Sequence, residues 1–141
     1  MKDDLYQKAI LDLAKRARQQ QRLESPDHTV TLDNPLCGDR ITLDLTTDGD
    51  LVIDAGHKTR GCLLCEAAAF LITDHAPGLS TPVLEKMAAD VLAGVDDESA
   101  SLEALWPGLE TLAPVRRYKS RRECVTLPFQ ALVNMLQDRG S

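Results

Sequence analysis

The sequence Ile41-Thr42-Leu43-Asp44-Leu45-Thr46-Thr47-Asp48-Gly49-Asp50-Leu51-Val52-Ile53 is the clearest structural signal in this chain. Apolar and polar residues alternate over Ile41–Leu45, and an apolar run resumes at Leu51–Ile53. The Asp-Gly step between these runs predicts a β-hairpin, because glycine tolerates the positive φ that a tight turn requires. Upstream, Thr29–Leu32 also alternates. We therefore expect a three-stranded, largely antiparallel sheet.

Helical patterns lie on both sides of this predicted sheet. From about Leu5 to Gln20, apolar residues recur with a helical period, and Ser25-Pro26-Asp27 then supplies turn residues. Downstream, helices are predicted over Cys62–His75, from Ser80 or Thr81 to Gly94, in a short segment before Trp106, and from about Arg121 to Gln137. The chain is therefore predicted to be a single α+β domain over residues 1–141. We expect the N-terminal helix and a C-terminal layer of helices to pack on the sheet of this domain.

Charge and hydropathy exclude some classes of function. The 141 residues carry a net charge of −6, and this argues against nucleic acid as the main partner, since phosphate binding requires a basic surface. No stretch approaches the roughly 20 apolar residues of a membrane span. The start, Met1-Lys2-Asp3-Asp4, lacks the apolar core of a signal peptide. We therefore expect a cytoplasmic protein with no membrane partner, whose thiols stay reduced.

The four cysteines lie in three separate segments, each at the predicted edge of an ordered element: 34–39, 61–65 and 121–128. Thiols and a carboxylate drawn from distant parts of a reduced chain are typical of a soft-metal or sulfur-handling site. Three thiolates and one carboxylate could close a tetrahedral zinc shell or hold iron with sulfide. The carboxylate would also give an exchangeable position, which suits transfer better than a permanent structural role.

Each segment also has a plainer interpretation. Cys37-Gly38-Asp39 could be a β-turn with an incidental cysteine. Cys62 starts a predicted helix, where free N–H groups favour a thiolate and lower its pKa. With Cys65 it forms a C-x-x-C pair, which could be half of a zinc site, a redox dithiol, or a functional cysteine beside a buried one. Cys124 is predicted to open the last helix, near Arg121, and could be a small core residue.

Together these segments resemble the U-type iron–sulfur cluster assembly proteins, a family that comprises IscU, SufU and the NifU N-terminal domain. The shared motifs are Asn-Pro-x-Cys-Gly-Asp-Arg at 34–40, Gly-Cys at 61–62, and Arg-x-x-Cys-x-x-Leu-Pro-x-x-Ala-Leu at 121–132. They occur in the family's order over nearly the whole chain. The length of the 74–114 stretch is closer to the SufU branch than to IscU.

The resemblance implies an iron–sulfur cluster assembly scaffold, or a zinc-dependent sulfur acceptor that receives persulfide sulfur from a cysteine desulfurase. Either role is a scaffold or sulfur relay rather than that of a turnover enzyme. The family's metal or cluster ligands fall on Cys37, Asp39, Cys62 and Cys124. Cys62 and Cys124 become the candidate sulfur acceptors, and Arg121 matches an arginine of the SufU pattern. The resemblance also implies zinc in the resting form, a transient 2Fe–2S cluster, and apo iron–sulfur proteins or cluster carriers as further partners.

Three positions depart from the family pattern. Thr59 replaces the first glycine of a Gly-x-Gly-Cys turn, which predicts a stiffer loop. Glu123 stands before the last cysteine, where the family carries histidine or lysine, and Cys65 replaces a small residue. Cys65 could be a packed thiol, a resolving thiol that takes persulfide, or a ligand in place of Asp39. We expect the packed thiol.

Two other classes of function stay open from the sequence. One is a structural zinc module with a closed, inert site, and the other is a dithiol redox protein that uses Cys62 and Cys65. The three histidines, His28, His57 and His75, lie in no motif and are expected at the surface or at helix caps. Trp106 is expected in the core or as a lid over the C-terminal helices.

Overall fold

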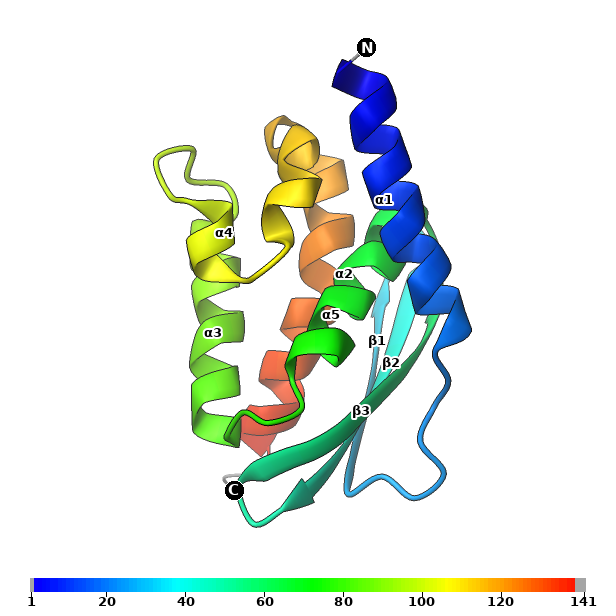
Figure 1. Cartoon of the computed structure of the whole chain (residues 1–141), viewed down its shortest axis with the longest axis vertical. Helices are drawn as coiled ribbons and strands as arrows, with labels where there is room; N and C mark the ends of the chain where they lie inside the picture. Colours follow the sequence, from blue (N-terminus) through cyan, green and yellow to red (C-terminus); the bar gives the residue numbers. More distant parts are fainter. Residues whose placement is uncertain (1, 139–141) are drawn as a thin grey trace.

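A three-stranded antiparallel sheet carries a layer of helices on one face, as Figure 1 shows. The computed structural model describes residues 2–138, without the side chains of 2–7, 117 and 138, so the ends of the predicted 1–141 domain lie outside it. In chain order the elements are α1 (Lys2–Gln19), β1 (His28–Asn34), β2 (Asp39–Asp48), β3 (Leu51–Arg60), α2 (Leu63–His75), α3 (Thr81–Gly94), α4 (Leu102–Leu105), the 3-10 helix η1 (Leu109–Arg117) and α5 (Lys119–Asp138). The predicted α+β class and three-stranded sheet are confirmed.

The predicted hairpin joins β2 to β3. Asp48 pairs with Leu51, which leaves Gly49 and Asp50 as the turn, and Gly49 has a φ of +60°. Both strands are longer than the alternating runs suggested, because β2 begins at Asp39 and β3 continues to Arg60. This extra length brings the start of β2 and the end of β3 together at one end of the sheet.

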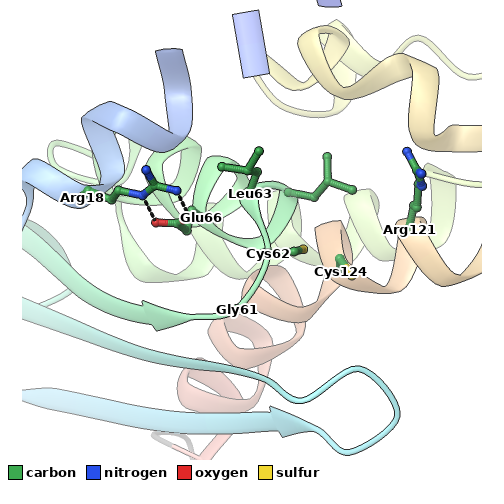
Figure 2. Close-up of a pocket in the computed structure, with 8 residues that line it drawn as sticks. Arg18, Gly61, Cys62, Leu63, Glu66, Arg121 and Cys124 are labelled. Atoms are coloured by element: carbon green, nitrogen blue, oxygen red, sulfur yellow. Dashed lines mark hydrogen bonds and ion pairs between the residues drawn. The ribbon is translucent and has the colours of Figure 1, made fainter. Parts of the chain in front are cut away.

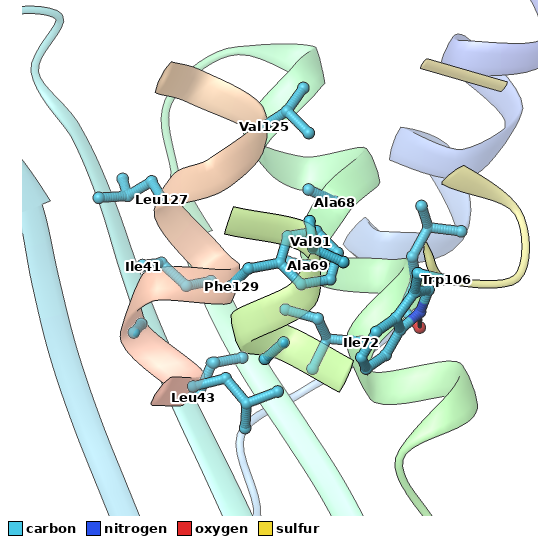
Figure 3. Close-up of a cluster of buried hydrophobic side chains, with 14 of the residues drawn as sticks. Ile41, Leu43, Ala68, Ala69, Ile72, Val91, Trp106, Val125, Leu127 and Phe129 are labelled. Carbon is cyan, nitrogen blue, oxygen red and sulfur yellow. Dashed lines mark hydrogen bonds between the residues drawn. The ribbon is translucent and has the colours of Figure 1, made fainter. Parts of the chain in front are cut away.

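The inner face of the sheet packs against α2 and α5, while α3 lies on the far side of α5 and α1 on α2. The inward residues of β2 are Ile41, Leu43 and Leu45, which are all buried. Trp106 is fully buried in the same core, and its Nε1 donates a hydrogen bond to Leu71 O at 3.0 Å. Its ring also meets Phe129 edge-on, with the centroids 5.1 Å apart (Figure 3). Trp106 is therefore a core residue that connects α2, α5 and the segment before η1.

The C-terminal helices differ from the prediction in two ways. Helix α5 begins at Lys119, so Pro128 lies inside it and Cys124 lies beyond its first turn instead of at its start. Pro128 has no N–H to donate to the Cys124 carbonyl, which loses its usual helical partner. The segment 109–117 is the 3-10 helix η1, and its buried residues Leu109, Leu112 and Val115 recur every third position, as that helix requires. Among the described residues, no helix is long and apolar enough to cross a membrane.

The segment after α1 crosses the outer face of the sheet. Asp44 points to this face and is fully buried under the segment, where its carboxylate accepts hydrogen bonds from Arg22, from Leu23 N at 3.1 Å and from Thr29 Oγ1 at 2.8 Å. Gly56 pairs with Asp44 across the strands, and a Cβ at Gly56 would lie 2.5 Å from Gln21 O. The close approach of the backbone therefore requires glycine at this position.

We expect Asp44→Asn to lower the free energy of unfolding at pH 7 by about 2 kcal/mol, the scale for hydrogen bonds to a buried charge. Burial alone would raise the pKa of the Asp44 carboxyl, but the hydrogen bonds from Arg22, Thr29 and Leu23 outweigh it and lower this pKa. A lowered pKa means that the stabilisation is complete above the unfolded value, about 3.9, and is lost as the pH falls through the lower folded value. Urea unfolding between pH 7 and pH 3 should show the two proteins converging in acid. A constant difference across that range would contradict this assignment.

Candidate metal centre

Three distant segments meet at the end of the sheet where β2 begins. The turn between β1 and β2 carries Cys37, and β2 itself begins with Asp39. A ligand atom from each of Cys37, Asp39 and Cys124 lies within 4.8 Å of the other two. The Cys62 thiol donates a hydrogen bond to Asp39 Oδ2 at 3.4 Å. All four positions that the sequence singled out are therefore brought together.

The turn that holds Cys37 is closed by local hydrogen bonds. Asn34 Oδ1 accepts from Leu36 N at 3.0 Å, and Asn34 O accepts from Gly38 N at 2.8 Å. Gly38 has a φ of +78°, a conformation that favours glycine. The Asn-Pro-x-Cys-Gly sequence therefore folds on itself and leaves the Cys37 side chain exposed at the edge of the sheet.

Asp39 and Cys62 are in direct contact. Cys62 is the N-cap of α2, as predicted, and its backbone N–H donates to Asp39 Oδ1 at 3.0 Å. The Asp39 side chain is buried, although it carries a carboxylate. Its two oxygens are thus both directed at Cys62, one at the amide and one at the thiol.

Burial controls the charge of the two inner thiols. The pKa of the Cys62 thiol is raised, chiefly because the side chain is removed from water. The pKa of the Cys124 thiol is also raised, by burial first and then by its hydrogen bonds with Cys62 and Asp39. The sequence predicted a lowered Cys62 pKa. In the structure, desolvation is the largest influence and raises this pKa, although hydrogen bonds with the Cys65 backbone and the Cys124 thiol act to lower it. A metal that binds here must displace these protons, so its affinity should rise with pH.

A cavity of about 550 Å³ opens beside the two inner thiols (Figure 2). Cys62, Cys124 and Gly61 line it together with Leu63 and Leu64, and two arginines stand at its sides. Arg121, the arginine that the sequence singled out, is exposed, with its guanidinium 5.5 Å from the ring centroid of Tyr118. Arg121 thus belongs to the rim of the cavity and lies one helical turn before Cys124 on α5.

The opposite side of the cavity holds an ion pair that the sequence did not indicate. Arg18 at the end of α1 donates two hydrogen bonds, of 2.7 and 2.9 Å, to the carboxylate of Glu66. Glu66 is buried on α2, where it is the single charged residue between Cys62 and Ile72. Only the approach of α1 to α2 creates this pair, so no local pattern could have identified it.

The expectation for the histidines is wrong for His57, which is buried on β3. Its Nδ1 lies 2.9 Å from Thr59 Oγ1, and burial lowers the pKa of the imidazole. Thr59 is itself part of β3, opposite Ile41, and not in a loop. His75 is half-buried near the end of α2, with its ring edge-on to Trp106, and His28 begins β1. None of the three histidines is in the group of close ligand atoms found among the described residues.

Cys65 is fully buried in the core and lies outside that group. Burial also raises the pKa of its thiol, first among several causes. Both observations favour the packed thiol over a resolving thiol or a ligand. Glu123, the other departure near the site, is half-buried on α5, where its backbone oxygen accepts from Thr126 Oγ1.

We expect Cys65→Ser to leave the metal content of the protein unchanged while lowering its melting temperature. The hydroxyl would be buried among apolar side chains, at a cost of about 1–3 kcal/mol. Zinc analysis of the purified variant, beside Asp39→Ala, checks the first part, and thermal unfolding checks the second. Loss of zinc in Cys65→Ser with retention in Asp39→Ala would instead make Cys65 the fourth ligand.

Comparisons of sequence and of structure with known proteins lead to the same family. The model of the NifU-like N-terminal domain matches residues 5–124. The chain is 34% identical to the zinc-dependent sulfurtransferase SufU of Bacillus subtilis over 92% of this chain and 88% of that protein. It is 29% identical to the iron–sulfur cluster assembly scaffold protein IscU of Streptococcus pyogenes, over 91% of this chain and 80% of that one. The crystal structure of a NifU-like N-terminal protein from Brucella abortus superposes with a TM-score of 0.82 at 26% identity, covering 96% of this chain and 94% of that chain.

Proposed function

Because this chain belongs to the NifU-like N-terminal domain family, which includes IscU and SufU, we propose that it serves iron–sulfur cluster assembly as a zinc-dependent sulfur acceptor. In this role it receives persulfide sulfur from a cysteine desulfurase and passes it on, as sulfur or as a transient 2Fe–2S cluster, to apo iron–sulfur proteins or cluster carriers. One observation carries the proposal. The ligand atoms of Cys37, Asp39 and Cys124 lie within 4.8 Å of one another, and the Cys62 thiol donates a hydrogen bond to Asp39.

The donor set fits zinc. Three thiols and one carboxylate can supply the four ligands of a tetrahedral zinc site, and thiolates are ligands that zinc prefers. Cys37, Asp39, Cys62 and Cys124 would hold the ion. When bound, zinc would keep the thiols deprotonated at neutral pH, where burial otherwise raises the pKa of Cys62 and Cys124.

The transfer itself is a thiol–persulfide exchange. A thiolate of this chain attacks the outer sulfur of the donor persulfide, and a new sulfur–sulfur bond forms as the old one breaks. The donor cysteine leaves as a thiolate, so no oxidant is consumed. Cys62 and Cys124, the acceptors expected from the sequence, face the cavity, but Cys37 is the exposed thiol. Accessibility to a protein donor therefore favours Cys37 as the first acceptor, with Cys62 and Cys124 as inner acceptors.

Incubation with a cysteine desulfurase and cysteine tests the proposal. Mass spectrometry of the alkylated, zinc-loaded protein should show the addition of sulfur at one or more of Cys37, Cys62 and Cys124, and the desulfurase should turn over faster. Tight zinc binding without sulfur transfer would instead indicate the structural zinc module. A disulfide between Cys62 and Cys65 would indicate the dithiol redox protein, which the burial of Cys65 disfavours.

A further inference from the structure

Gly61 lies directly against the Asp39 carboxylate. A Cβ built on Gly61 would overlap Asp39 Oδ1, and it would lie 2.6 Å from Asp39 Cγ and 2.9 Å from Asp39 Cβ. Asp39 is only 3% exposed, so its side chain has little room to turn away. Any side chain at Gly61 would therefore displace the carboxylate.

The Asp39 carboxylate has a structural task at this position. The N-cap residue of α2, Cys62, makes no side-chain capping bond of its own. In many helices a Glu or Gln three residues after the cap accepts from the N-cap amide, but here that residue is Cys65. Asp39 Oδ1 accepts from this amide instead, from the neighbouring strand, while Oδ2 accepts from the Cys62 thiol.

We propose that Gly61 is a positioning residue of the site. The space left by its missing side chain holds the Asp39 carboxylate between the amide and the thiol of Cys62, and this fixes how its oxygens face Cys37 and Cys124. The expected effect of Gly61 on zinc affinity rests on the proposed function, in which this site binds zinc. The contact between Gly61 and Asp39 does not depend on any metal.

A second property of Gly61 has to be separated from this contact. Its φ is +159°, at the edge of the region that residues with a Cβ rarely adopt. Gly61→Ala therefore carries a backbone cost as well as the collision with Asp39. Only the collision depends on the size of residue 39, so a double-mutant cycle distinguishes the two.

The experiment compares the wild type, Gly61→Ala, Asp39→Ala and the double variant. Zinc affinity is measured by competition with chelators of graded strength, and melting temperature is measured on the metal-free proteins. We expect Gly61→Ala to weaken zinc binding by about 10–100-fold, the range for residues that orient a ligand. In the Asp39→Ala background the same change should weaken binding by less than about 2-fold, because no carboxylate remains to be displaced. In the metal-free proteins, Gly61→Ala should likewise lower the melting temperature less in the Asp39→Ala background than in the wild type.

Gly49→Ala is the matched control for backbone strain. Gly49 has a φ of +60° in the β2–β3 turn, and a Cβ there would meet nothing within 4 Å. This variant should lose melting temperature and keep its zinc affinity. An equal loss of zinc affinity from Gly61→Ala in both backgrounds would overturn the proposal.

Failure to fold is also informative. If Gly61→Ala does not fold and the double variant does, the rescue supports the contact, whereas failure of both would show that backbone strain dominates and would overturn the proposal. A wild-type protein that binds no zinc would contradict the proposed function. The melting temperatures of the four metal-free proteins would still show whether the effects of Gly61→Ala and Asp39→Ala depend on each other.

Discussion

Replacing Cys124 with serine is expected to weaken zinc binding by about 100-fold or more. Structural zinc sites bind with about 10–16 kcal/mol, so each of four ligands contributes roughly 3 kcal/mol, or about two powers of ten in affinity. Cys124 comes from α5, and its ligand atom lies within 4.8 Å of those of Cys37 and Asp39. A serine hydroxyl stays protonated near neutral pH and cannot replace the thiolate.

Chelator competition measures this loss, and Cys65→Ser is the matched control because Cys65 is buried outside the group of ligand atoms. Because zinc binding also contributes free energy to folding, the zinc-dependent gain in melting temperature should be clearly smaller in Cys124→Ser than in the wild type. Wild-type affinity in the Cys124→Ser variant would remove Cys124 from the ligand set.

Trp106→Ala should lower the free energy of unfolding by about 3–5 kcal/mol, the cost of deleting a buried aromatic side chain. Total stabilities of domains are about 5–15 kcal/mol, so this single change should remove about a third or more of the stability of a typical domain. The ring is fully buried, packs edge-on against Phe129 and donates to Leu71 O. Its removal would leave a cavity between α2, α5 and the segment before η1.

Trp106→Phe separates the two contributions of this side chain. It keeps most of the packing and loses the hydrogen bond to Leu71 O, so it should cost less, about 1–2 kcal/mol. Circular dichroism in urea must follow both variants, because Trp106 is the only tryptophan of the chain. A loss below about 1 kcal/mol for Trp106→Ala would contradict its central place in the core.

The features that the sequence predicted well are those with a local cause. The Asp-Gly step gave the β2–β3 turn, and Ser80 with Pro82 gave the start of α3, because turn and cap chemistry act within a few residues. The cysteine segments identified which residues meet, since Cys37, Asp39, Cys62 and Cys124 do lie together. The selection of these four, with Cys65 left out, came from the family that the motifs resemble.

The features that the sequence missed depend on what packs across from them. The burial of His57, the ion pair between Arg18 and Glu66, and the raised pKa of Cys62 all result from tertiary neighbours. The last helix was predicted to begin at about Arg121, with Cys124 near its start. In the structure, the helix accepts proline inside it and begins at Lys119.

The separation of the four proposed ligands along the chain has a consequence for how the protein is made. Cys37 and Asp39 belong to the β1–β2 hairpin, Cys62 to the start of α2, and Cys124 to the last helix. Domains fold as units while synthesis proceeds from the N-terminus. Cys124 is made after the other three, and α5 packs against the sheet, α2 and α3, so the domain cannot be complete before α5 is available. The proposed four-ligand site is therefore complete only after α5 has docked, so any metal that needs all four ligands binds the folded domain and not a partly made chain.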